Sequence, residues 1–530
     1  MFSDESAADI SARPVSVEPV PLTALADHLG LSDSGFGRTD AGSVSVTGIA
    51  LASGSVRSGD LYAALPGTRH HGAQFVSQAT ERGAVAVLTD PAGVDHLGDT
   101  DVPTLVVDQP RRRLGDLAAL IYGHPARFMT LIGVTGTQGK TTTTQLISCG
   151  LQACGRHTAV IGTMGTWIDG EQVTTVLTTP EAPDLHALFA AMVERGVDVC
   201  AMEVSSHAVV MGRVDGVVFD LAVFTNFGRD HLDFHADVNA YFAAKAELFT
   251  ASRSRRALLN IDDDRVAELS CEPAIPTRTI SLTGRDADWT AEVLTARADG
   301  STFVVTGPGQ LRIKADIALS GSFNVANALC ALAAIGEAGH DVEVAALGLA
   351  ALPSVRGRME RVDSGQPFSV LVDYAHKPDA VTAALEALRA VTEGRVILVI
   401  GAGGERDAGK RQLMGAAAAH LADVVVVTDD NPRGEDPAAI RAELLAGAHA
   451  VTDGTTDVLE VADRETAIRS AVAAARAGDC VLIAGKGHEQ GQEVAGRVLP
   501  FDDREVARRA LAAVAGVRYA SPDLGPEKNS

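Results

Sequence analysis

Short apolar runs alternate with helical segments over most of the chain. Residues 129–134, 197–203 and 221–225 are almost wholly apolar, and segments that read as helices, such as 141–153, separate them. Strands that are apolar on both faces are typical of parallel sheets covered by helices on both sides. The same pattern returns between Ala-rich helical segments nearer the C-terminus, in the runs 369–374, 396–400, 424–428 and 480–484. The chain therefore predicts two successive α/β sheets, whose ligands would bind beyond the carboxyl ends of the strands.

The first 109 residues have a more mixed pattern. They predict a helix over 75–82 and short strands over 44–50, 61–64, 85–89 and 104–107. We expect an α/β protein of three domains: a small N-terminal α/β domain over 1–109, a central parallel-sheet domain over 110–354 and a C-terminal Rossmann-like domain over 355–530. Residues 1–20 and 521–530 are polar, and we expect both ends to lie outside the folded domains.

Length and charge narrow the class of protein. A chain of 530 residues is too long for one core and, at about 150 residues per domain, suggests three or four folding units. The formal net charge of −23 argues against a nucleic-acid or membrane-surface binder, because such partners require broad positive surfaces. In such an acidic chain, clusters of Arg and Lys in loops indicate where an anionic ligand would bind, because they would make the local charge positive.

The sequence also predicts a cytoplasmic location. The first ten residues, MFSDESAADI, are acidic and lack the apolar stretch of a secretory signal. The apolar runs are far shorter than the ~20 residues of a membrane-spanning helix. The six cysteines contain no CxxC pair, and several lie in apolar segments, which favours reduced core cysteines.

A Gly- and Thr-rich loop follows the apolar run 129–134. Its sequence, TGTQGKTT over 135–142, leads directly into the predicted helix. Glycines allow a backbone to wrap around phosphate, while Lys140 would reach the β- and γ-phosphates and Thr141 would bind Mg²⁺. The strict P-loop pattern has glycine where this chain has Val134, so the loop is a variant. It predicts ATP binding by a P-loop ATPase-like central sheet.

Two further segments carry candidate metal ligands. Glu203 ends an apolar strand, where a P-loop enzyme would hold a second Mg²⁺ contact, although a carboxylate there could also only anchor a loop. The segment 226–235, NFGRDHLDFH, holds two aspartates and two histidines, which raises zinc as an alternative. Zinc sites usually rest on three or four well-spaced ligands, so one histidine joining Glu203 and phosphate oxygens around Mg²⁺ fits better.

Motifs in all three predicted domains resemble the Mur ligases. They are TGTQGKTTTT (135–144), EVSSHA (203–208), NFGRDHLDFH (226–235), the lysine of AAK (243–245), GSFNVANALCA (321–331), GRMERV (357–362) and DYAHKPDA (373–380). The resemblance extends over roughly residues 45–510. It implies an ATP-dependent ligase of peptidoglycan precursor synthesis, a process that supports cell-wall biogenesis, cell shape and cell division.

The resemblance implies a reaction in two steps. ATP phosphorylates the side-chain carboxylate of D-Glu in UDP-MurNAc-L-Ala-D-Glu, and an incoming amine then displaces phosphate from the acyl phosphate. Phosphorylation is needed because a carboxylate is a poor electrophile, so the protein supplies positioning and charge neutralisation by Mg²⁺, Lys and Arg. The implied partners are small molecules, and we expect the chain to act as a monomer.

The resemblance also assigns roles to individual residues. The implied catalytic set is Lys140, Glu203, His231 and Lys245. The implied ATP-binding set is Gly136, Thr137, Gln138, Gly139, Lys140, Thr141, Thr142, Asn324, Asn327, Arg358 and Asp373. The implied metal ligands are Thr141, Glu203, His231 and a carbamylated Lys245, with a plain surface lysine as the alternative at 245. The implied contacts to the UDP-muramoyl dipeptide are Leu51, Ser53, Thr68, Arg69, His70, Thr178, Thr179, Ser205 and Arg213.

Three positions depart from the family pattern. Gln138 stands where the family usually has Asn in the phosphate loop. Ala52-Ser53-Gly54 stands in place of Asp-Ser-Arg, which weakens the implied uridine contacts. Met211 stands where a Gln is often found, two residues before the substrate-binding Arg213.

Three loops that follow apolar strands bear on which amino acid is added. They read GAGGERD (401–407), DNPR (430–433) and GKGHE (485–489), and together they suit a ligand with carboxylate and ammonium groups. DNPR resembles the family's motif for meso-diaminopimelate, and the implied contacts are Arg406, Asp430, Asn431, Pro432, Arg433, Gly485 and Glu489. Arg433 would fork the distal carboxylate, while Glu489 and Gly485 would hold the ammonium end. Lysine would leave Arg433 unpaired, at a cost of ~1–3 kcal/mol, so diaminopimelate is expected.

Two alternatives remain open at this point. A sibling ligase could add L-lysine or act at another step, including folylpolyglutamate synthesis. A protein of a different class, a P-loop switch or motor, would use the third domain to bind a partner. A ligase should release phosphate only with both the nucleotide-linked peptide and an amine, whereas a switch or motor should hydrolyse ATP without them.

Overall fold

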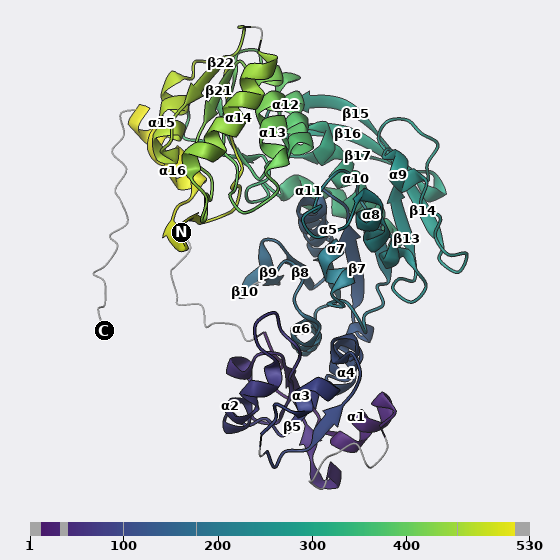
Figure 1. Cartoon of the computed structure of the whole chain (residues 1–530). Coiled ribbons are helices and arrows are strands. Elements are labelled where there is room, and N and C mark those ends of the chain that lie inside the picture. Colours follow the sequence, from purple (N-terminus) through teal and green to yellow (C-terminus); the bar gives the residue numbers. More distant parts are fainter. Residues whose placement is uncertain (1–11, 32–40, 99, 176, 453, 515–530) are drawn as a thin grey trace. The chain divides into compact units, whose positions relative to one another are not determined.

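The computed structural model describes residues 12–31, 41–98, 100–175, 177–452 and 454–514 (Figure 1). The chain divides into two compact units, and each is built of strands and covering helices. The first unit comprises Met1–Thr290, Gly307–Gln310 and Asn327–Gly348, and the second comprises Ala291–Thr306, Leu311–Ala326 and Leu349–Ser530. This is the α/β class that the sequence predicts, while the expected domain boundaries at 109/110 and 354/355 stay predictions.

The N-terminal part of the first unit contains a four-stranded parallel sheet in the order β3-β4-β5-β6. Its strands are β3 (Gly48–Ala50), β4 (Asp60–Ala63), β5 (Ala86–Thr89) and β6 (Thr104–Val106). The helices of this part are α1 (Leu22–Leu29), α2 (Val76–Glu81), α3 (Pro91–Val94) and α4 (Leu114–Ile121). The predicted strand 44–50 is two strands, because β2 (Ser45–Val46) pairs antiparallel with β1 (Val20–Pro21) whereas β3 pairs with β4.

The prediction that residues 1–20 lie outside the fold is wrong for the described part of that segment. Arg13 Nη1 lies 2.7 Å from Asp60 Oδ2, and Asp60 is buried at the start of β4. A buried carboxylate requires a partner, and here the partner comes from the polar N-terminal segment. Residues 1–11 and the predicted tail 521–530 lie outside the described residues.

The central sheet of the first unit has the strand order β10-β9-β8-β11-β7-β12-β13-β14. Its parallel strands are β7 (Thr130–Thr135), β8 (Thr158–Gly162), β11 (Val199–Glu203), β12 (Leu221–Phe224), β13 (Ala257–Asn260) and β14 (Thr277–Ser281). β9 (Gly165–Ile168) and β10 (Glu171–Val173) form an antiparallel edge. The helices are α5 (Lys140–Ala153), α6 (Ala182–Glu194), α7 (Ser206–Val210), α8 (Val238–Ala246) and α9 (Asp264–Ala267). The three strands predicted between 129 and 225 are confirmed to within one or two residues at each end.

The second unit contains a six-stranded sheet in the order β18-β19-β23-β20-β21-β22. The edge strand β18 (Glu360–Arg361) is antiparallel, and the parallel strands are β19 (Ser369–Asp373), β20 (Val396–Ile400), β21 (Val424–Val427), β22 (Asp457–Glu460) and β23 (Cys480–Ala484). One core cluster joins the sheet to α12 (Pro378–Arg389), α13 (Gly409–Leu421) and α14 (Pro437–Val451). A second cluster joins alternate residues of the same strands to α15 (Arg464–Ala474) and α16 (Asp503–Val514). Helices therefore cover both faces, as predicted.

Several elements were not predicted from the sequence. Among them are β9 and β10, the neighbouring strands β15 (Trp289–Arg297), β16 (Gly300–Gly307) and β17 (Leu311–Ile317), the hairpin of β24 (Gly491–Val494) and β25 (Arg497–Pro500), and the helices α10 (Ser322–Glu337) and α11 (Val342–Ala351). Most of these strands mix polar and apolar residues, so they lack the continuous apolar runs that marked the buried strands.

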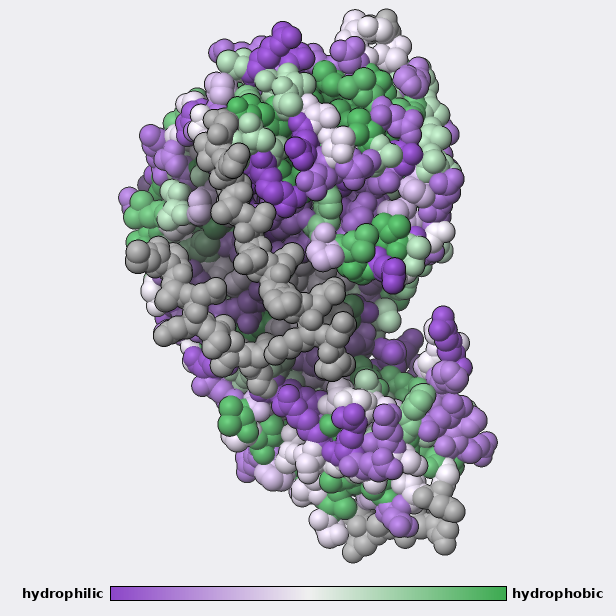
Figure 2. Space-filling model, turned by 90° about the vertical axis from the view of Figure 1, so that its left-hand side faces the viewer, coloured by the Kyte–Doolittle hydropathy of each residue, from purple (hydrophilic) through white to green (hydrophobic). Residues whose placement is uncertain are grey.

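Hydrophobic and hydrophilic residues are interspersed on the face of the molecule drawn in Figure 2. Large apolar side chains that are exposed include Phe128, Leu347 and Val498. Such scattered exposure is normal for folded proteins. Among the described residues, no helix combines the length and the apolarity that spanning a membrane requires.

Candidate active site

The phosphate loop connects β7 to α5, and its glycines adopt conformations that other residues avoid. Gly136 has φ 143° and Gly139 has φ 83°. A Cβ atom at Gly139 would lie 2.3 Å from Asn327 Oδ1, so only glycine lets the Asn327 side chain lie against the loop. The first turn of α5 follows at once, and the backbone N–H groups of a helix N-terminus favour bound phosphate.

The segment that follows β12 holds the phosphate loop in place. Thr225 Oγ1 donates to the carbonyl oxygen of Gln138 at 2.6 Å, and the backbone N–H of Gln138 donates to Asn226 Oδ1 at 2.9 Å. Lys140 Nζ donates to the carbonyl oxygen of Gly136 at 2.8 Å, which folds the lysine over the loop. Contacts with neighbouring protein groups therefore hold the loop in this shape, and a fixed shape suits the positioning of a phosphate.

Glu203 and Thr141 lie together beside the phosphate loop, because β11 and β7 are adjacent strands. Glu203 is 1% exposed, and its Oε1 accepts hydrogen bonds from Thr141 Oγ1 at 2.9 Å and from the Thr163 backbone N–H at 2.7 Å. A hydroxyl and a carboxylate are the oxygen ligands that Mg²⁺ prefers. These two residues therefore fit the predicted metal role.

Lys245 lies at the phosphate loop and is 1% exposed, which contradicts the plain surface lysine of the alternative interpretation. Its Nζ donates to the Gly136 carbonyl oxygen at 2.8 Å and lies 4.7 Å from the centroid of the Tyr241 ring. The position suits a group that acts on phosphate, while carbamylation stays a prediction.

His231 is less tightly held than the other predicted metal ligands. Its Nε2 lies 3.0 Å from Asp230 Oδ2, and its ring centroid lies 4.7 Å from that of His207. Burial, reinforced by the neighbouring His231 and His235, lowers the pKa of His207 to about 4, so His207 is neutral at pH 7. The role of His231 as a ligand stays a prediction.

The residues expected to bind the dipeptide surround Glu203. Thr179 Oγ1 donates to the Glu203 carbonyl oxygen at 2.9 Å, and the Ser205 backbone N–H lies 3.5 Å from the same hydroxyl. Thr178 Oγ1 lies 3.4 Å from Thr163 Oγ1. Arg213 Nη1 donates to the Thr179 carbonyl oxygen at 3.4 Å. The structure thus brings all four predicted residues to one place, beside the predicted metal ligands.

The predicted uridine contacts lie at one edge of the N-terminal sheet. Leu51 and Ser53 follow β3, and Thr68, Arg69 and His70 follow β4, its parallel neighbour. Ser53 Oγ donates to Gln78 Oε1 at 2.7 Å. The three residues after β4 are exposed, so they are accessible to a ligand, and uridine contact stays a prediction.

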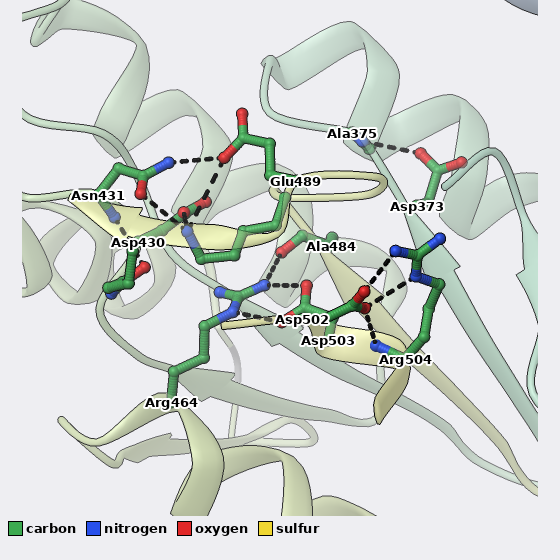
Figure 3. Close-up of polar contacts among 12 residues, drawn as sticks. Asp373, Ala375, Asp430, Asn431, Arg464, Ala484, Glu489, Asp502, Asp503 and Arg504 are labelled. Atoms are coloured by element: carbon green, nitrogen blue, oxygen red, sulfur yellow. Dashed lines mark hydrogen bonds and ion pairs between the residues drawn. The ribbon is translucent and has the colours of Figure 1, made fainter. Parts of the chain in front are cut away.

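Three predicted ATP contacts, Asn324, Arg358 and Asp373, lie in the second unit. Asp373, at the end of β19, accepts a hydrogen bond from the backbone N–H of Ala375 at 2.7 Å (Figure 3). It accepts a second, also at 2.7 Å, from the backbone N–H of Met359. Burial raises the pKa of Asp373, while Arg358 and these two donors oppose the rise. The guanidinium of Arg358 lies 4.6 Å from the centroid of the Tyr374 ring. On α10, the Asn324 side-chain amide donates to the Ser320 carbonyl oxygen at 2.7 Å.

Asp430 and Asn431 of the DNPR motif lie close to Glu489 of the GKGHE motif (Figure 3). The two motifs meet around Lys486, which is fully buried. Lys486 Nζ lies 3.1 Å from Asp430 Oδ1 and donates to Asn431 Oδ1 at 2.9 Å. The Asn431 side-chain amide donates to Glu489 Oε2 at 2.7 Å. Burial raises the pKa of Glu489, with Asp430 acting in the same direction and Lys486 against it. A Cβ atom at Gly485 would lie 2.3 Å from Asp430 Oδ2, so this position requires glycine.

Arg433 extends this polar rim of the second unit. Its Nη1 donates to the Gly404 carbonyl oxygen at 2.7 Å, and its Nε lies 3.0 Å from Glu493 Oε2. Arg406 is exposed on the loop that contains Gly404, and Pro432 is buried within the motif. The structure therefore gathers the loops after β20, β21 and β23 on one edge of the sheet, as strand order predicts.

Thr163, Glu181, Lys486 and Glu493 are among the residues at these sites that were given no role in the sequence analysis. Thr163 binds Glu203, and Glu181 Oε1 accepts from Arg213 Nε at 2.9 Å. Lys486 and Glu493 contact the DNPR motif. Of these four, only Lys486 had a signal in the sequence, because it lies inside GKGHE, whereas the contacts of the others depend on which segments of the fold are neighbours.

Three domains of the Mur ligase family match successive parts of the chain. The Mur ligase family, catalytic domain matches residues 45–122, the Mur ligase middle domain matches 134–335, and the Mur ligase, glutamate ligase domain matches 357–487. The chain belongs to the Mur ligase family.

Individual relatives are similar over nearly the whole chain. The UDP-N-acetylmuramoyl-L-alanyl-D-glutamate--2,6-diaminopimelate ligase of Streptomyces avermitilis is 54% identical over 508 residues, which are 95% of this chain and 99% of the relative. The ligase of the same name from Corynebacterium glutamicum is 48% identical and covers 89% of this chain and 92% of its own. A solved structure of a ligase with this name is 31% identical, has a TM-score of 0.65, and covers 89% of this chain and 96% of that chain.

Proposed function

We propose that this chain is an ATP-dependent ligase that joins meso-diaminopimelate to the D-Glu of UDP-MurNAc-L-Ala-D-Glu in peptidoglycan precursor synthesis. The observation that carries the proposal is the rim on which Lys486 joins Asp430, Asn431 and Glu489, with Arg433 beside them. The names of the relatives agree with this assignment. The protein works in the cytoplasm as a monomer.

The first step activates a carboxylate. The backbone of the phosphate loop and Lys140 bind the phosphates of ATP, and Arg213 with Thr179 orients the peptide carboxylate. An oxygen of the D-Glu side chain attacks the γ-phosphorus, the bond from that phosphorus to the bridging oxygen breaks, and ADP leaves. Mg²⁺ held by Thr141 and Glu203 would supply charge neutralisation when bound.

The second step forms the amide. The neutral amine of the amino acid attacks the carbonyl carbon of the acyl phosphate, and the resulting tetrahedral centre collapses with loss of phosphate. The nitrogen gives up one proton to water or to the departing phosphate, so the products are an amide, ADP and phosphate. Arg433 selects the amino acid, because a guanidinium fits a second carboxylate that lysine lacks.

The test is phosphate release with ATP, Mg²⁺ and UDP-MurNAc-L-Ala-D-Glu, together with mass spectrometry of the nucleotide product. We expect release with meso-diaminopimelate, a much slower reaction with L-lysine, and a product heavier by one diaminopimelate residue. Arg433→Ala should abolish the preference for diaminopimelate. The matched control is Arg469→Ala, which removes an arginine that is exposed on α15.

Other outcomes would favour other assignments. Equal or faster reaction with L-lysine would identify a lysine-adding ligase and would contradict the role of Arg433. ATP hydrolysis that needs neither the nucleotide-linked peptide nor an amine would favour a P-loop switch or motor.

A further inference from the structure

We propose that Glu493 is a specificity-determining residue, whose carboxylate occupies the Arg433 guanidinium until the distal carboxylate of the substrate displaces it. The inference rests on the proposed function and concerns a residue outside the motifs that the family resemblance assigns. Its starting point is the ion pair in which Arg433 Nε lies 3.0 Å from Glu493 Oε2.

Backbone hydrogen bonds hold Glu493 next to Arg433. The Arg433 N–H donates to the Glu493 carbonyl oxygen at 3.0 Å, and the Ala495 N–H donates to the Arg433 carbonyl oxygen at 2.7 Å. The Glu493 N–H donates to Asn431 Oδ1 at 2.9 Å. These bonds tie β24 to the DNPR motif, so the Glu493 carboxylate is a tethered competitor with a high effective concentration at Arg433.

The contact itself is weak enough to be replaced. The Glu493 side chain is 39% exposed and that of Arg433 is 22% exposed, and ion pairs with such access to water contribute little. The Glu493 side chain can therefore turn away from Arg433 into solvent, where its charge is hydrated. A substrate carboxylate that is already held at its other end would take its place.

Arg433 does not depend on Glu493 for its orientation. Its Nη1 donates to the Gly404 carbonyl oxygen at 2.7 Å, and its backbone N–H and carbonyl groups are bonded to Glu493 on β24 and to Ala495 just after it. The guanidinium would thus keep its position when Glu493 leaves, with Nε open to a new acceptor. This arrangement indicates competition with the substrate, and it argues against a supporting role for Glu493.

The competition has opposite consequences for two amino acids. Diaminopimelate must displace Glu493, which weakens its apparent binding. Lysine brings no second carboxylate, so Glu493 can stay paired with Arg433 and the partly buried guanidinium keeps an acceptor. Glu493 should therefore reduce the discrimination between the two substrates.

The variant that tests this inference is Glu493→Gln, which keeps the size of the side chain and removes its charge. We expect KM for meso-diaminopimelate to fall about two- to fivefold with kcat unchanged, the range that a partly exposed ion pair supports. The kcat/KM for L-lysine should stay the same or fall, so the ratio of the two kcat/KM values should rise. An unchanged or higher KM for diaminopimelate, or a lower ratio, would overturn the inference.

Two controls isolate the Arg433 contact. In an Arg433→Ala background, Glu493→Gln should no longer change KM for diaminopimelate, and a persisting effect would contradict the inference. Glu386→Gln removes the same charge from an exposed position on α12 and should leave both substrates unaffected. Thermal unfolding of each variant checks that the fold is intact.

The reactions of the wild-type protein distinguish failure of the proposed ligase function from failure of the proposed role of Glu493. Absence of diaminopimelate-dependent phosphate release in the wild-type protein would overturn the proposed function and this inference together. Activity in the wild type combined with no fall in KM for Glu493→Gln would overturn this inference alone.

Discussion

At the scale of single residues, the rim of the second unit is organised by one buried ammonium group. Lys486 is fully buried and contacts Asp430, Asn431 and the Gly491 carbonyl oxygen, the last at 2.9 Å. Burying a charge is unfavourable unless partners replace the lost water, and these three partners do so. The lysine therefore fixes the spacing between the DNPR and GKGHE motifs, although it need not touch the amino acid.

Replacing Lys486 with methionine should lower the stability of the fold and weaken binding of diaminopimelate more than it slows the reaction. Lys486→Met keeps the length of the side chain but leaves Asp430 buried without its cation, and removing one partner of a buried pair costs about 3–5 kcal/mol. We expect the free energy of unfolding, measured by urea denaturation, to fall by that amount, and KM for diaminopimelate to rise more than kcat falls. Lys314→Met, at an exposed position of β17, is the matched control. A variant as stable as the wild type would contradict this account of the pair.

His186 should make stability depend on pH. It is fully buried on α6, and burial lowers its pKa from 6.5 to about 4, while Nε2–H donates to the Asp215 carbonyl oxygen at 3.0 Å. A lowered pKa in the folded state gives stability that is complete above pH 6.5 and is lost as the pH falls towards 4. Protonation of the unfolded chain alone would then cost the fold about 3 kcal/mol at pH 4.

His186→Gln removes this titration while keeping a side-chain donor. The difference in unfolding free energy between wild type and variant should shrink by about 3 kcal/mol from pH 7 to pH 4. The exposed His157 is a control of opposite sign, because its hydrogen bond and ion pair with Asp169 raise its pKa. Its contribution is present below pH 6.5 and is lost as the pH rises. Parallel pH profiles for wild type and His186→Gln would show that His186 does not carry the effect.

At the scale of elements, the shape of the phosphate loop depends on two side chains, Thr225 and Asn327, that fill the space next to its glycines. A Cβ atom at Gly136 would lie 2.0 Å from Thr225 Oγ1, and one at Gly139 would lie 2.3 Å from Asn327 Oδ1. A strand end, a loop and a helix start are thus packed against side chains that come from much later in the chain. The side chains of Thr225 and Asn327 leave no room for a Cβ atom at Gly136 or Gly139, and the same close packing restricts movement of the loop.

Gly139→Ala should weaken ATP binding without unfolding the protein. An alanine at 139 can relieve the contact with Asn327, and a left-handed conformation that costs it about 1–2 kcal/mol, only if the loop leaves its phosphate-binding shape, so we expect at least a tenfold loss of ATP affinity in a calorimetric titration. Gly155→Ala tests separately the cost of placing alanine in a left-handed backbone conformation. Gly155 has φ 73° just beyond the other end of α5, and an added Cβ atom would meet no other atom within 4 Å, so ATP affinity should be unchanged there. Equal losses in both variants would show that the effect is not specific to the loop.

The elements also show how far the sequence could predict the site. Apolar runs located the strands, and polar residues at their ends located the phosphate loop, Glu203 and the DNPR motif, because strand ends carry the ligands of such sheets. Thr163 and Glu493 escaped prediction for a different reason. Thr163 lies 40 residues from Glu203 and meets it only because β8 and β11 are neighbours. Glu493 lies on a hairpin whose mixed residues give no clear period, so its contact with Arg433 required the fold.

At the scale of the whole molecule, the groups assigned to one reaction belong to two compact units. The phosphate loop and Glu203 are in the first unit, and Arg358, Asp373 and the rim around Lys486 are in the second. Acyl transfer requires the activated carboxylate and the amine to come within reacting distance. The chain has a formal net charge of −23 and two of the proposed substrates are anionic nucleotides, so bound cations and Arg or Lys side chains must offset repulsion when the groups meet.

We therefore expect substrates to change the arrangement of the two units. Small-angle scattering should show a smaller radius of gyration with a non-hydrolysable ATP analogue, Mg²⁺, UDP-MurNAc-L-Ala-D-Glu and diaminopimelate than with any one ligand alone. Arg358→Ala should reduce this compaction while leaving binding of the ATP analogue to the phosphate loop largely intact, because Arg358 belongs to the other unit. The matched control, Arg469→Ala, removes an exposed arginine of the second unit and should compact normally. If the radius of gyration does not change while the wild-type enzyme turns over, the units are already arranged for reaction, and Arg358 would then act by charge alone.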